Sequence, residues 1–233
     1  MTRLTTQLPL PLDKGQRPAL GRDAFLIAPA NEAAVAWIDR WPDWPAPGLV
    51  LQGPPGSGKT HLASVWRARA DAGLVEGAAL TAQAVPALLE SARELVVENA
   101  QLAPEEPLLH LYNGLAERSG HLLLTAAAAP ARWGVALADL RSRLNALPVA
   151  ELGAPDDALI RAVLIKLFAD RQLSVTAELL DYLGLRIERS FAMARRVVAA
   201  IDSVSLAAHR RITIPLAQKV LEELGTAGEG EEP

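Results

Sequence analysis

The chain has 233 residues, of which half are hydrophobic and none is cysteine, and its formal net charge is −4. The absence of cysteine excludes disulfides, thiolate zinc sites and cysteine nucleophiles, and it fits a reducing compartment. The negative charge argues against a surface-wide attraction to nucleic acid, and no apolar run approaches the roughly 18 to 20 residues that span a bilayer. We therefore expect a soluble cytoplasmic protein, without a membrane partner, whose contact with DNA is indirect.

The first 17 residues are predicted to form an extended or disordered arm, because they contain two prolines and one glycine and show no helical periodicity. Within the arm, the motif Gln7-Leu8-Pro9-Leu10-Pro11-Leu12 alternates leucine with proline. Prolines keep such a backbone extended and present the leucines to an apolar pocket on a partner. From the residues alone, a loosely docked tail is an equally good interpretation.

A helix is predicted over residues 32–40, with Asn31 as its N-cap, after the apolar run 24–27. The Trp-Pro-rich segment 41–47 ends this helix. We expect the tryptophans to pack in the core and in loops rather than to stack on bases, because few basic residues lie beside them.

Residues 49–52 are a predicted strand that leads into a complete phosphate-binding loop of the form G-x-x-x-x-G-K-[ST], Gly53-Pro54-Pro55-Gly56-Ser57-Gly58-Lys59-Thr60. Glycines allow backbone N–H groups to surround phosphate oxygens, and the helix that begins near Lys59 adds its positive end. Lys59 is expected to neutralise the outer phosphates and Thr60 to ligate Mg²⁺. A glycine-rich turn without a ligand is much the weaker alternative. His61 adjoins the loop, where a structural role is favoured over a catalytic one.

The strand predicted over residues 95–99 follows a strand over 77–81 and a helix over 85–92, and it ends in Glu98 and Asn99. Glu98 stands where phosphate-loop proteins hold the carboxylate that orients magnesium. Asn99 stands where a second acid would polarise the attacking water, and an amide cannot accept a proton. We therefore expect slow hydrolysis by this chain alone.

Two more strands are predicted, over residues 121–125 and 148–152, the first of them after a helix over 107–118. The hydroxyl of Thr125, at the end of its strand, is expected either to reach the γ-phosphate or the attacking water or merely to end the strand. Spacing alone does not separate these interpretations.

A short helix over residues 138–144 carries Arg141 and Arg143 near its C-terminus. Cations at this end of a helix interact favourably with the helix dipole and are easily solvated. From spacing alone, a surface role is therefore favoured over a functional one for both arginines.

The strand predictions alternate with helices, which predicts an α/β domain with a parallel sheet, helices on both faces and a ligand at the carboxyl ends of the strands. After Gly153 only helices are predicted, over residues 155–170, 177–186, 191–209 and 214–224. The predicted organisation is an arm over 1–17, an α/β base over 18–152, an all-helical lid over 153–224 and an acidic disordered tail over 225–233.

From about residue 18 to residue 224 the chain resembles the AAA+ ATPases, and within them the DnaA group. The resemblance rests on the phosphate loop in a five-stranded base followed by a helical lid, and on short segments: Phe25 to Asn31, Gly58-Lys59-Thr60-His61-Leu62, Leu123-Leu124-Thr125, Asp139-Leu140-Arg141-Ser142-Arg143-Leu144 and Arg211-Ile212-Thr213-Ile214-Pro215. DnaA proteins continue into a DNA-binding helix-turn-helix domain, which we do not expect in this chain.

The arm instead resembles the peptide by which bacterial replication proteins bind the sliding clamp of DNA polymerase. Its combination with a DnaA-like base and lid is similar to the Hda family, DnaA-related regulators that dock on the DNA-loaded clamp and make DnaA hydrolyse its ATP. The resemblance implies a bacterial protein at the replisome, with the clamp and DnaA as partners. The residues that would occupy the clamp are Gln7, Leu8, Leu10 and Leu12.

The resemblance also implies a nucleotide site for ADP or ATP with Mg²⁺. Phe25 to Asn31 would border the adenine, and Glu98 would join Thr60 in the metal shell. The phosphates would be held by Gly53, Pro54, Gly56, Ser57, Gly58, Lys59, Thr60 and His61. Arg143 matches the arginine finger, which would be inserted in trans at the γ-phosphate of DnaA-bound ATP, with Arg141 as the fallback.

One departure from the family pattern lies in the lid, where the position of the second sensor arginine falls on Ala192. Arg195 and Arg196 follow about one turn later and are retained as nucleotide-binding candidates. The preference between ADP and ATP therefore stays open, as does a homo-oligomer with head-to-tail AAA+ contacts.

Three functions follow from these observations: an activator of DnaA's ATP hydrolysis, a self-sufficient AAA+ ATPase of the helicase-loader type, and a passive clamp adaptor stabilised by nucleotide. The pair Glu98-Asn99 favours the first over the second, since it predicts weak intrinsic hydrolysis.

Overall fold

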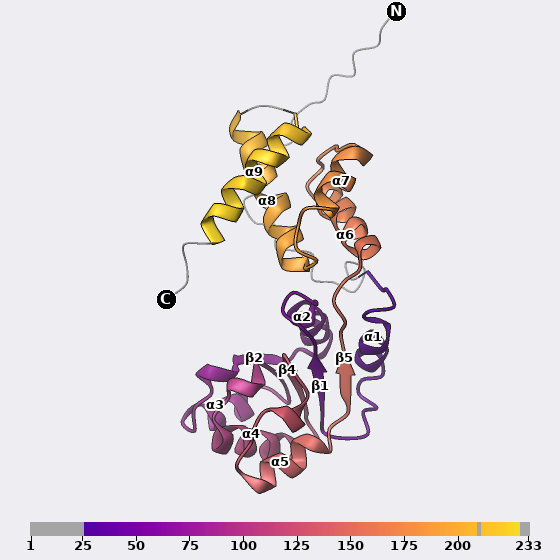
Figure 1. Ribbon diagram of the computed structural model, residues 1–233. Coiled ribbons are helices and arrows are strands. Elements are labelled where there is room, and N and C mark those ends of the chain that lie inside the picture. The colour runs from indigo at the N-terminus through magenta and orange to yellow at the C-terminus, as the bar shows by residue number, and fades with distance from the viewer. Residues whose placement is uncertain (1–25, 209–210, 229–233) are drawn as a thin grey trace, which may run out of the picture.

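The computed structural model describes residues 26–208 and 211–228, which form an α/β base and an all-helical lid joined by the segment after β5 (Figure 1). The predicted arm with its clamp-type motif, Gln7 to Leu12, lies outside the described residues. So do Phe25 and residues 229–233 of the predicted tail.

The base contains a five-stranded sheet whose order is β2-β3-β4-β1-β5. Its strands are β1 (Gly48–Gln52), β2 (Gly73–Glu76), β3 (Glu94–Glu98), β4 (His121–Ala126) and β5 (Val149–Glu151). Every neighbouring pair runs parallel, so the carboxyl ends of the strands meet at one edge. The predicted five-stranded parallel sheet is confirmed.

Helices cover both faces of this sheet, and each face has its own core. The base helices are α1 (Glu32–Asp39), α2 (Lys59–Ala70), α3 (Ala84–Ser91), α4 (Glu105–Glu117) and α5 (Ala138–Asn145), with short 3₁₀ turns η2 (Gly77–Ala79), η3 (Ala100–Leu102) and η4 (Pro130–Arg132). Along β1, Leu49 and Leu51 join the core beneath α1 and α2, whereas Val50 joins the core beneath α4 and α5. Because β1 is packed on both faces in this way, the start of the loop that follows it is held in a fixed position.

The strand predicted over residues 77–81 is wrong: the strand there is β2, which pairs with β3 from Gly73 opposite Leu95 to Glu76 opposite Glu98. Residues 77–79 form η2, and Gly77 packs so closely on the neighbouring backbone that a Cβ would lie 2.5 Å from the Asn99 carbonyl oxygen. β2 is a four-residue edge strand with alternate residues exposed, so hydrophobicity favoured the apolar run that follows it.

The tryptophans near the N-terminus pack inside the base, as predicted. Trp44 stacks on Trp66 with ring centroids 5.4 Å apart, and Trp41 meets Trp66 edge-on at 6.0 Å. The indole Nε1 of Trp44 donates to the carbonyl of Trp37 at 2.8 Å. These rings therefore anchor the segment between α1 and β1.

The lid has a core of its own, formed by α6 (Asp157–Asp170), α7 (Ala177–Gly184), α8 (Phe191–Ala208) and α9 (Ile214–Gly228). The Asp156 carboxylate caps α6 by accepting from the Leu159 N–H at 2.7 Å. α9 continues four residues past its predicted end at Leu224, because that leucine still packs against the lid core. Among the described helices, none is long and apolar enough to cross a bilayer.

Candidate nucleotide site

The phosphate loop joins the carboxyl end of β1 to α2, at the edge of the sheet that faces the lid (Figure 1). Gly56 and Gly58 have φ angles of 74° and 98°, in the region where side chains are strained. Gly58 is the N-cap of α2 and gives it no side-chain cap, so the first N–H groups of the helix are available to an anion. Ser57 is 1% exposed, and its Oγ has no hydrogen-bond partner among the described residues. A phosphate fits this set of donors.

The Lys59 ammonium bridges the loop, since its Nζ donates to the carbonyls of Gly53 at 2.7 Å and Pro54 at 2.8 Å. Burial lowers the pKa of Lys59, and the Glu98 carboxylate opposes this shift. Phosphate oxygens are stronger, charge-assisted acceptors than carbonyls. The lysine is therefore placed to exchange these carbonyls for the phosphates of a nucleotide.

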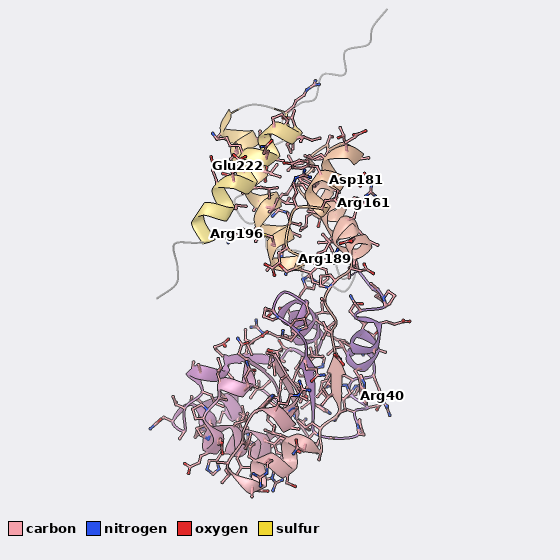
Figure 2. All side chains as sticks on the ribbon, viewed as in Figure 1. Arg40, Arg161, Asp181, Arg189, Arg196 and Glu222 are labelled. Atoms are coloured by element: carbon pink, nitrogen blue, oxygen red, sulfur yellow. The ribbon has the colours of Figure 1, made fainter. Side chains whose placement is uncertain are left out.

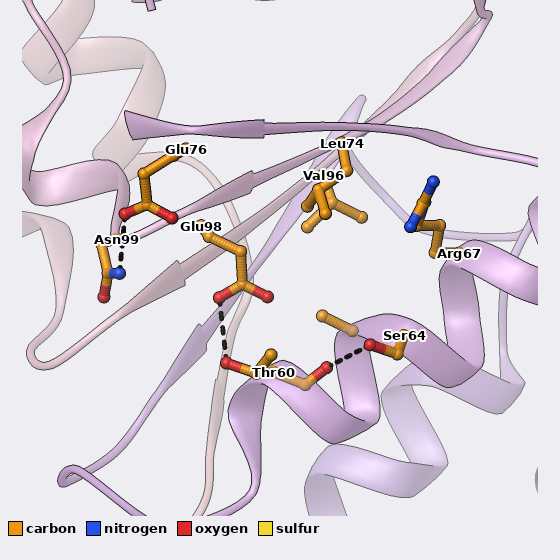
Figure 3. A pocket seen from close by; sticks show the side chains of 9 residues that line it. Thr60, Ser64, Arg67, Leu74, Glu76, Val96, Glu98 and Asn99 are labelled. Atoms are coloured by element: carbon orange, nitrogen blue, oxygen red, sulfur yellow. Dashed lines mark hydrogen bonds between the residues drawn. The ribbon is translucent and has the colours of Figure 1, made fainter. Parts of the chain in front are cut away.

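Glu98, at the end of β3, accepts two hydroxyl hydrogen bonds at its Oε2. Thr60 Oγ1 on α2 donates at 3.2 Å (Figure 3), and Thr125 Oγ1 on β4 donates at 2.6 Å. Hydroxyl and carboxylate oxygens suit Mg²⁺, so Thr60 and Glu98 fit the predicted metal role. Among the described residues there is no cluster of three or more His, Asp or Glu side chains that could hold a metal. A Mg²⁺ here would take its other ligands from phosphate and water.

Thr125 is fully buried, and both functions of its hydroxyl are used inside the protein. Its Oγ1 accepts from the Asn99 N–H at 3.0 Å and donates to Glu98. This makes Thr125 a positioning residue for Glu98. The predicted contact with the γ-phosphate would require the hydroxyl to give up the bond that it donates to Glu98.

Thr125→Val is expected to lower the free energy of unfolding by about 1 to 3 kcal/mol, because it leaves the Asn99 N–H without a partner and removes one of the two hydroxyl donors of the buried Glu98 carboxylate. Urea denaturation measures this loss, and Thr125→Ser, which keeps the hydroxyl, is the control. A valine variant as stable as the wild type would contradict the positioning role.

Asn99 turns its side chain away from the phosphate loop. The residue is in the left-handed conformation with φ 51°, and its Nδ2 donates to Glu76 Oε1 on β2 at 2.8 Å (Figure 3). The side chain at the position where other phosphate-loop proteins have a second acid is thus hydrogen-bonded to the edge strand β2. Glu76 was missed in the sequence because β2 was misplaced, and the correct register puts it opposite Glu98.

A groove of about 270 Å³ runs from Thr60 and Glu98 along α2 to β2 (Figure 3). Its walls include Ser64 and Arg67 from α2 and Leu74 from β2. Because Thr60 and Glu98 line the groove, solvent can reach the two side chains that are expected to ligate Mg²⁺.

Asn31 shapes the segment that was predicted to border the adenine. The residue is 2% exposed, its Oδ1 accepts from the Ala28 N–H and its Nδ2 donates to the Leu26 carbonyl, both at 2.9 Å. It occupies the N-cap position of α1, as predicted, but its side chain makes no capping bond there. Because the Gly153 N–H donates to the Ala30 carbonyl at 2.8 Å, the segment also lies against the start of the connection to the lid.

Of the two lid arginines, the structure brings Arg195 to the helix that follows the loop. Its Nη1 donates to His61 Nδ1, in the first turn of α2, at 3.2 Å. Burial, followed by the charges of Arg195 and Lys166, lowers the pKa of His61, which keeps the imidazole neutral and able to accept. Arg196 is exposed, as is Ala192 in the first turn of α8. The structural role favoured for His61 therefore consists of a contact between base and lid.

Arg143 lies at the opposite end of the base. Helix α5 precedes the amino end of β5, whereas the phosphate loop follows the carboxyl end of the parallel neighbour β1, and Figure 1 shows α5 at the end of the base remote from the lid. Arg143 therefore cannot reach the chain's own loop.

The Arg143 side chain is held in place by two neighbours. Its Nε donates to Asp139 Oδ1 at 2.9 Å, and its guanidinium lies 5.7 Å from the ring centroid of Tyr112 on α4. Arg141 is exposed and donates to the nearby Val135 carbonyl at 3.2 Å. The Asp139 contact could have been found from the i,i+4 spacing, whereas the Tyr112 contact depends on how α4 and α5 pack.

Comparisons with known proteins agree with this architecture. Residues 157–221 match the family model described as the lid domain of Hda. The chain is 25% identical over 239 residues to the chromosomal replication initiator protein DnaA of Thermomicrobium roseum, an alignment that covers 91% of this chain and 51% of the relative. The chain thus spans about half the length of this curated relative.

Among solved structures, domain III of the Thermotoga maritima DnaA superimposes with a TM-score of 0.75 at 16% identity, covering 92% of this chain and 98% of that one. AMPPCP-bound DnaA from Aquifex aeolicus gives 0.67 at 16% identity, covering 79% and 65%. The chain therefore has a DnaA-like AAA+ fold, and the predicted resemblance is confirmed.

Proposed function

We propose that this DnaA-like AAA+ protein with an Hda-type lid is a clamp-tethered, adenine-nucleotide-bound regulator that stimulates ATP hydrolysis by DnaA and so restrains replication initiation. The observation that carries the proposal is the position of Arg143. This residue lies on α5, at the end of the base remote from the chain's own phosphate loop. Because an arginine placed there cannot reach the chain's own nucleotide, a role as an arginine finger would have to be on a nucleotide held by another molecule.

The chain's own nucleotide is ADP or ATP, held at the phosphate loop. Lys59 and the N–H groups at the start of α2 bind the phosphates, and Thr60 and Glu98 hold Mg²⁺, which neutralises phosphate charge when bound. Support comes from the orphaned Ser57 hydroxyl and from the likeness to a DnaA structure bound to AMPPCP.

Intrinsic turnover is slow in this proposal. The residue after Glu98 is an amide, which cannot accept a proton from water, and its Nδ2 donates to Glu76. The nucleotide therefore stabilises the base and lid while the chemistry takes place on the partner.

The partner's nucleotide is the target of Arg143. Asp139 and Tyr112 restrict this side chain, so less rotamer freedom is lost when it enters a neighbouring site. A guanidinium at the γ-phosphate stabilises the charge that develops during phosphoryl transfer. AAA+ geometry supplies the head-to-tail contact by analogy.

The clamp would be bound by Gln7, Leu8, Leu10 and Leu12, which lie outside the described residues. Deleting residues 7–12 is expected to weaken clamp binding at least tenfold, since on the order of 1.4 kcal/mol or more of apolar contact is lost. Surface plasmon resonance on immobilised clamp measures this change, and substituting residues 2–6 with glycine and serine is the control. Unchanged clamp binding after the deletion would remove the arm from the proposal.

The whole function is tested by single-turnover hydrolysis of DnaA-bound ATP with purified chain and DNA-loaded clamp. We expect stimulation that requires both the clamp and Arg143. Brisk hydrolysis by the chain alone, without an effect on DnaA, would support the self-sufficient ATPase. Clamp binding without stimulation would support the passive adaptor.

A further inference from the structure

The first turn of α8 in the lid contacts the phosphate loop directly. The Phe191 N–H donates to the Gly56 carbonyl at 3.1 Å. Ser190 is 4% exposed and caps α8, since its Oγ accepts from the Met193 N–H at 3.1 Å. The approach is so close that a Cβ on Gly56 would lie 2.3 Å from the Ser190 Cβ.

A second contact lies one turn further along α8. Arg195 donates to His61 in the first turn of α2, directly after the loop. Two successive turns of one lid helix therefore hold the loop and the helix that follows it. Each contact joins residues that are more than a hundred positions apart in sequence. His61 and Arg195, for example, are separated by 134 positions.

The Gly56–Ser57 peptide unit is fixed on both sides by these arrangements. Its carbonyl accepts from the lid, and its N–H donates to the Pro54 carbonyl at 3.3 Å. A glycine-rich loop loses much conformational entropy when it becomes ordered around a ligand. A contact that orders the loop beforehand lowers this cost and so raises affinity.

We infer that the start of α8 is a brace that holds the phosphate loop ready for nucleotide, with Ser190, Phe191 and Arg195 as positioning residues. The inference rests on the nucleotide binding proposed above. Because the brace acts through the backbone of the loop rather than on the γ-phosphate, it raises the affinity for ADP and ATP by the same factor.

The first test compares Phe191→Pro with Phe191→Ala. Residue 191 is the first residue of α8, where proline is well tolerated, so the proline variant removes the N–H donor and keeps the helix start. Both variants lose the partly buried ring, so the difference between them isolates the hydrogen bond. Relative to Phe191→Ala, we expect Phe191→Pro to bind both ADP and ATP about fivefold to tenfold more weakly in calorimetric titrations.

A second readout does not need nucleotide. In the unliganded protein, the backbone N–H groups of Gly58, Lys59 and Thr60 are expected to exchange hydrogen faster in Phe191→Pro than in Phe191→Ala, because the loop is less ordered. Equal exchange rates and equal affinities in the two variants would overturn the brace. If the two variants differ in hydrogen exchange as expected but the wild-type chain binds neither ADP nor ATP, the proposed function would instead be overturned.

A second pair of variants covers the outcome in which Phe191→Pro does not fold. Arg195→Met removes the contact with His61 and keeps the aliphatic stem. Its control is Arg161→Met, which breaks only an exposed ion pair of 2.8 Å with Asp181, on the lid (Figure 2). Arg195→Met is expected to weaken ADP and ATP equally, by about threefold or more relative to the control. Weakening of ATP alone would overturn the brace and assign Arg195 to the γ-phosphate.

Discussion

Arg143→Ala is expected to lower the stimulated hydrolysis of DnaA-bound ATP by on the order of a thousandfold, the scale at which an arginine finger acts. The reason is electrostatic, because the Arg143 guanidinium would supply the positive charge at the γ-phosphate. Arg141, which donates to the Val135 carbonyl, is not expected to replace this charge. The variant should fold normally, because the ion pair that it loses with Asp139 is exposed and such pairs contribute little. Single-turnover hydrolysis with DNA-loaded clamp measures the effect.

Two variants sharpen this result. Arg141→Ala should keep most of the stimulation, and the reverse pattern, with Arg141→Ala inactive and Arg143→Ala active, would move the finger by two residues. Asp139→Asn keeps the arginine and a hydrogen-bond acceptor beside it but removes the ion pair, so we expect only a modest loss, about twofold to fivefold. Nucleotide binding by the chain itself should be unchanged in all three variants, since α5 lies far from the chain's own loop.

Asn99→Asp is expected to raise the chain's intrinsic ATP hydrolysis by about a hundredfold, the lower range for an added general base. The amide donates to Glu76 in the present structure, and an aspartate cannot keep that bond. Two carboxylates at this distance repel each other, so the new side chain should turn away from Glu76 on β2. Steady-state turnover with Mg²⁺ and ATP measures the gain.

The matched control is Asn99→Ala, which also breaks the bond to Glu76 but adds no carboxylate, and it should not gain turnover. Adding Glu98→Gln to Asn99→Asp should abolish the gain, because the metal would lose its protein carboxylate. Equal turnover in the aspartate and alanine variants would show that the amide at position 99 is not what keeps hydrolysis slow.

The parts of this site that could be predicted are those that a short stretch of sequence specifies by itself. The loop from Gly53 to Thr60 was identified from its motif, and Glu98 from its place at the end of an apolar strand. Each of these depends on local geometry: a strand, a turn that needs glycine, and a helix start.

The parts that could not be predicted depend on packing between distant segments. Thr125 reaches Glu98 only because β3 and β4 are neighbours in register, and Glu76 faces Asn99 only because β2 lies at the edge of the sheet. The contact of Phe191 with Gly56 depends on how the lid sits above the base, and nothing in the sequence near either residue indicates it.

Arg143 and the phosphate loop lie at opposite ends of the base, so the two surfaces that would take part in an assembly are different. One would supply the arginine and the other the nucleotide site, so an assembly built through these surfaces is heterologous and not a closed two-fold dimer. Under the proposed function, each chain then serves one DnaA nucleotide at a time, and the assembly remains open at the chain's own nucleotide edge. The ratio of the two proteins at maximal stimulation should accordingly approach one to one.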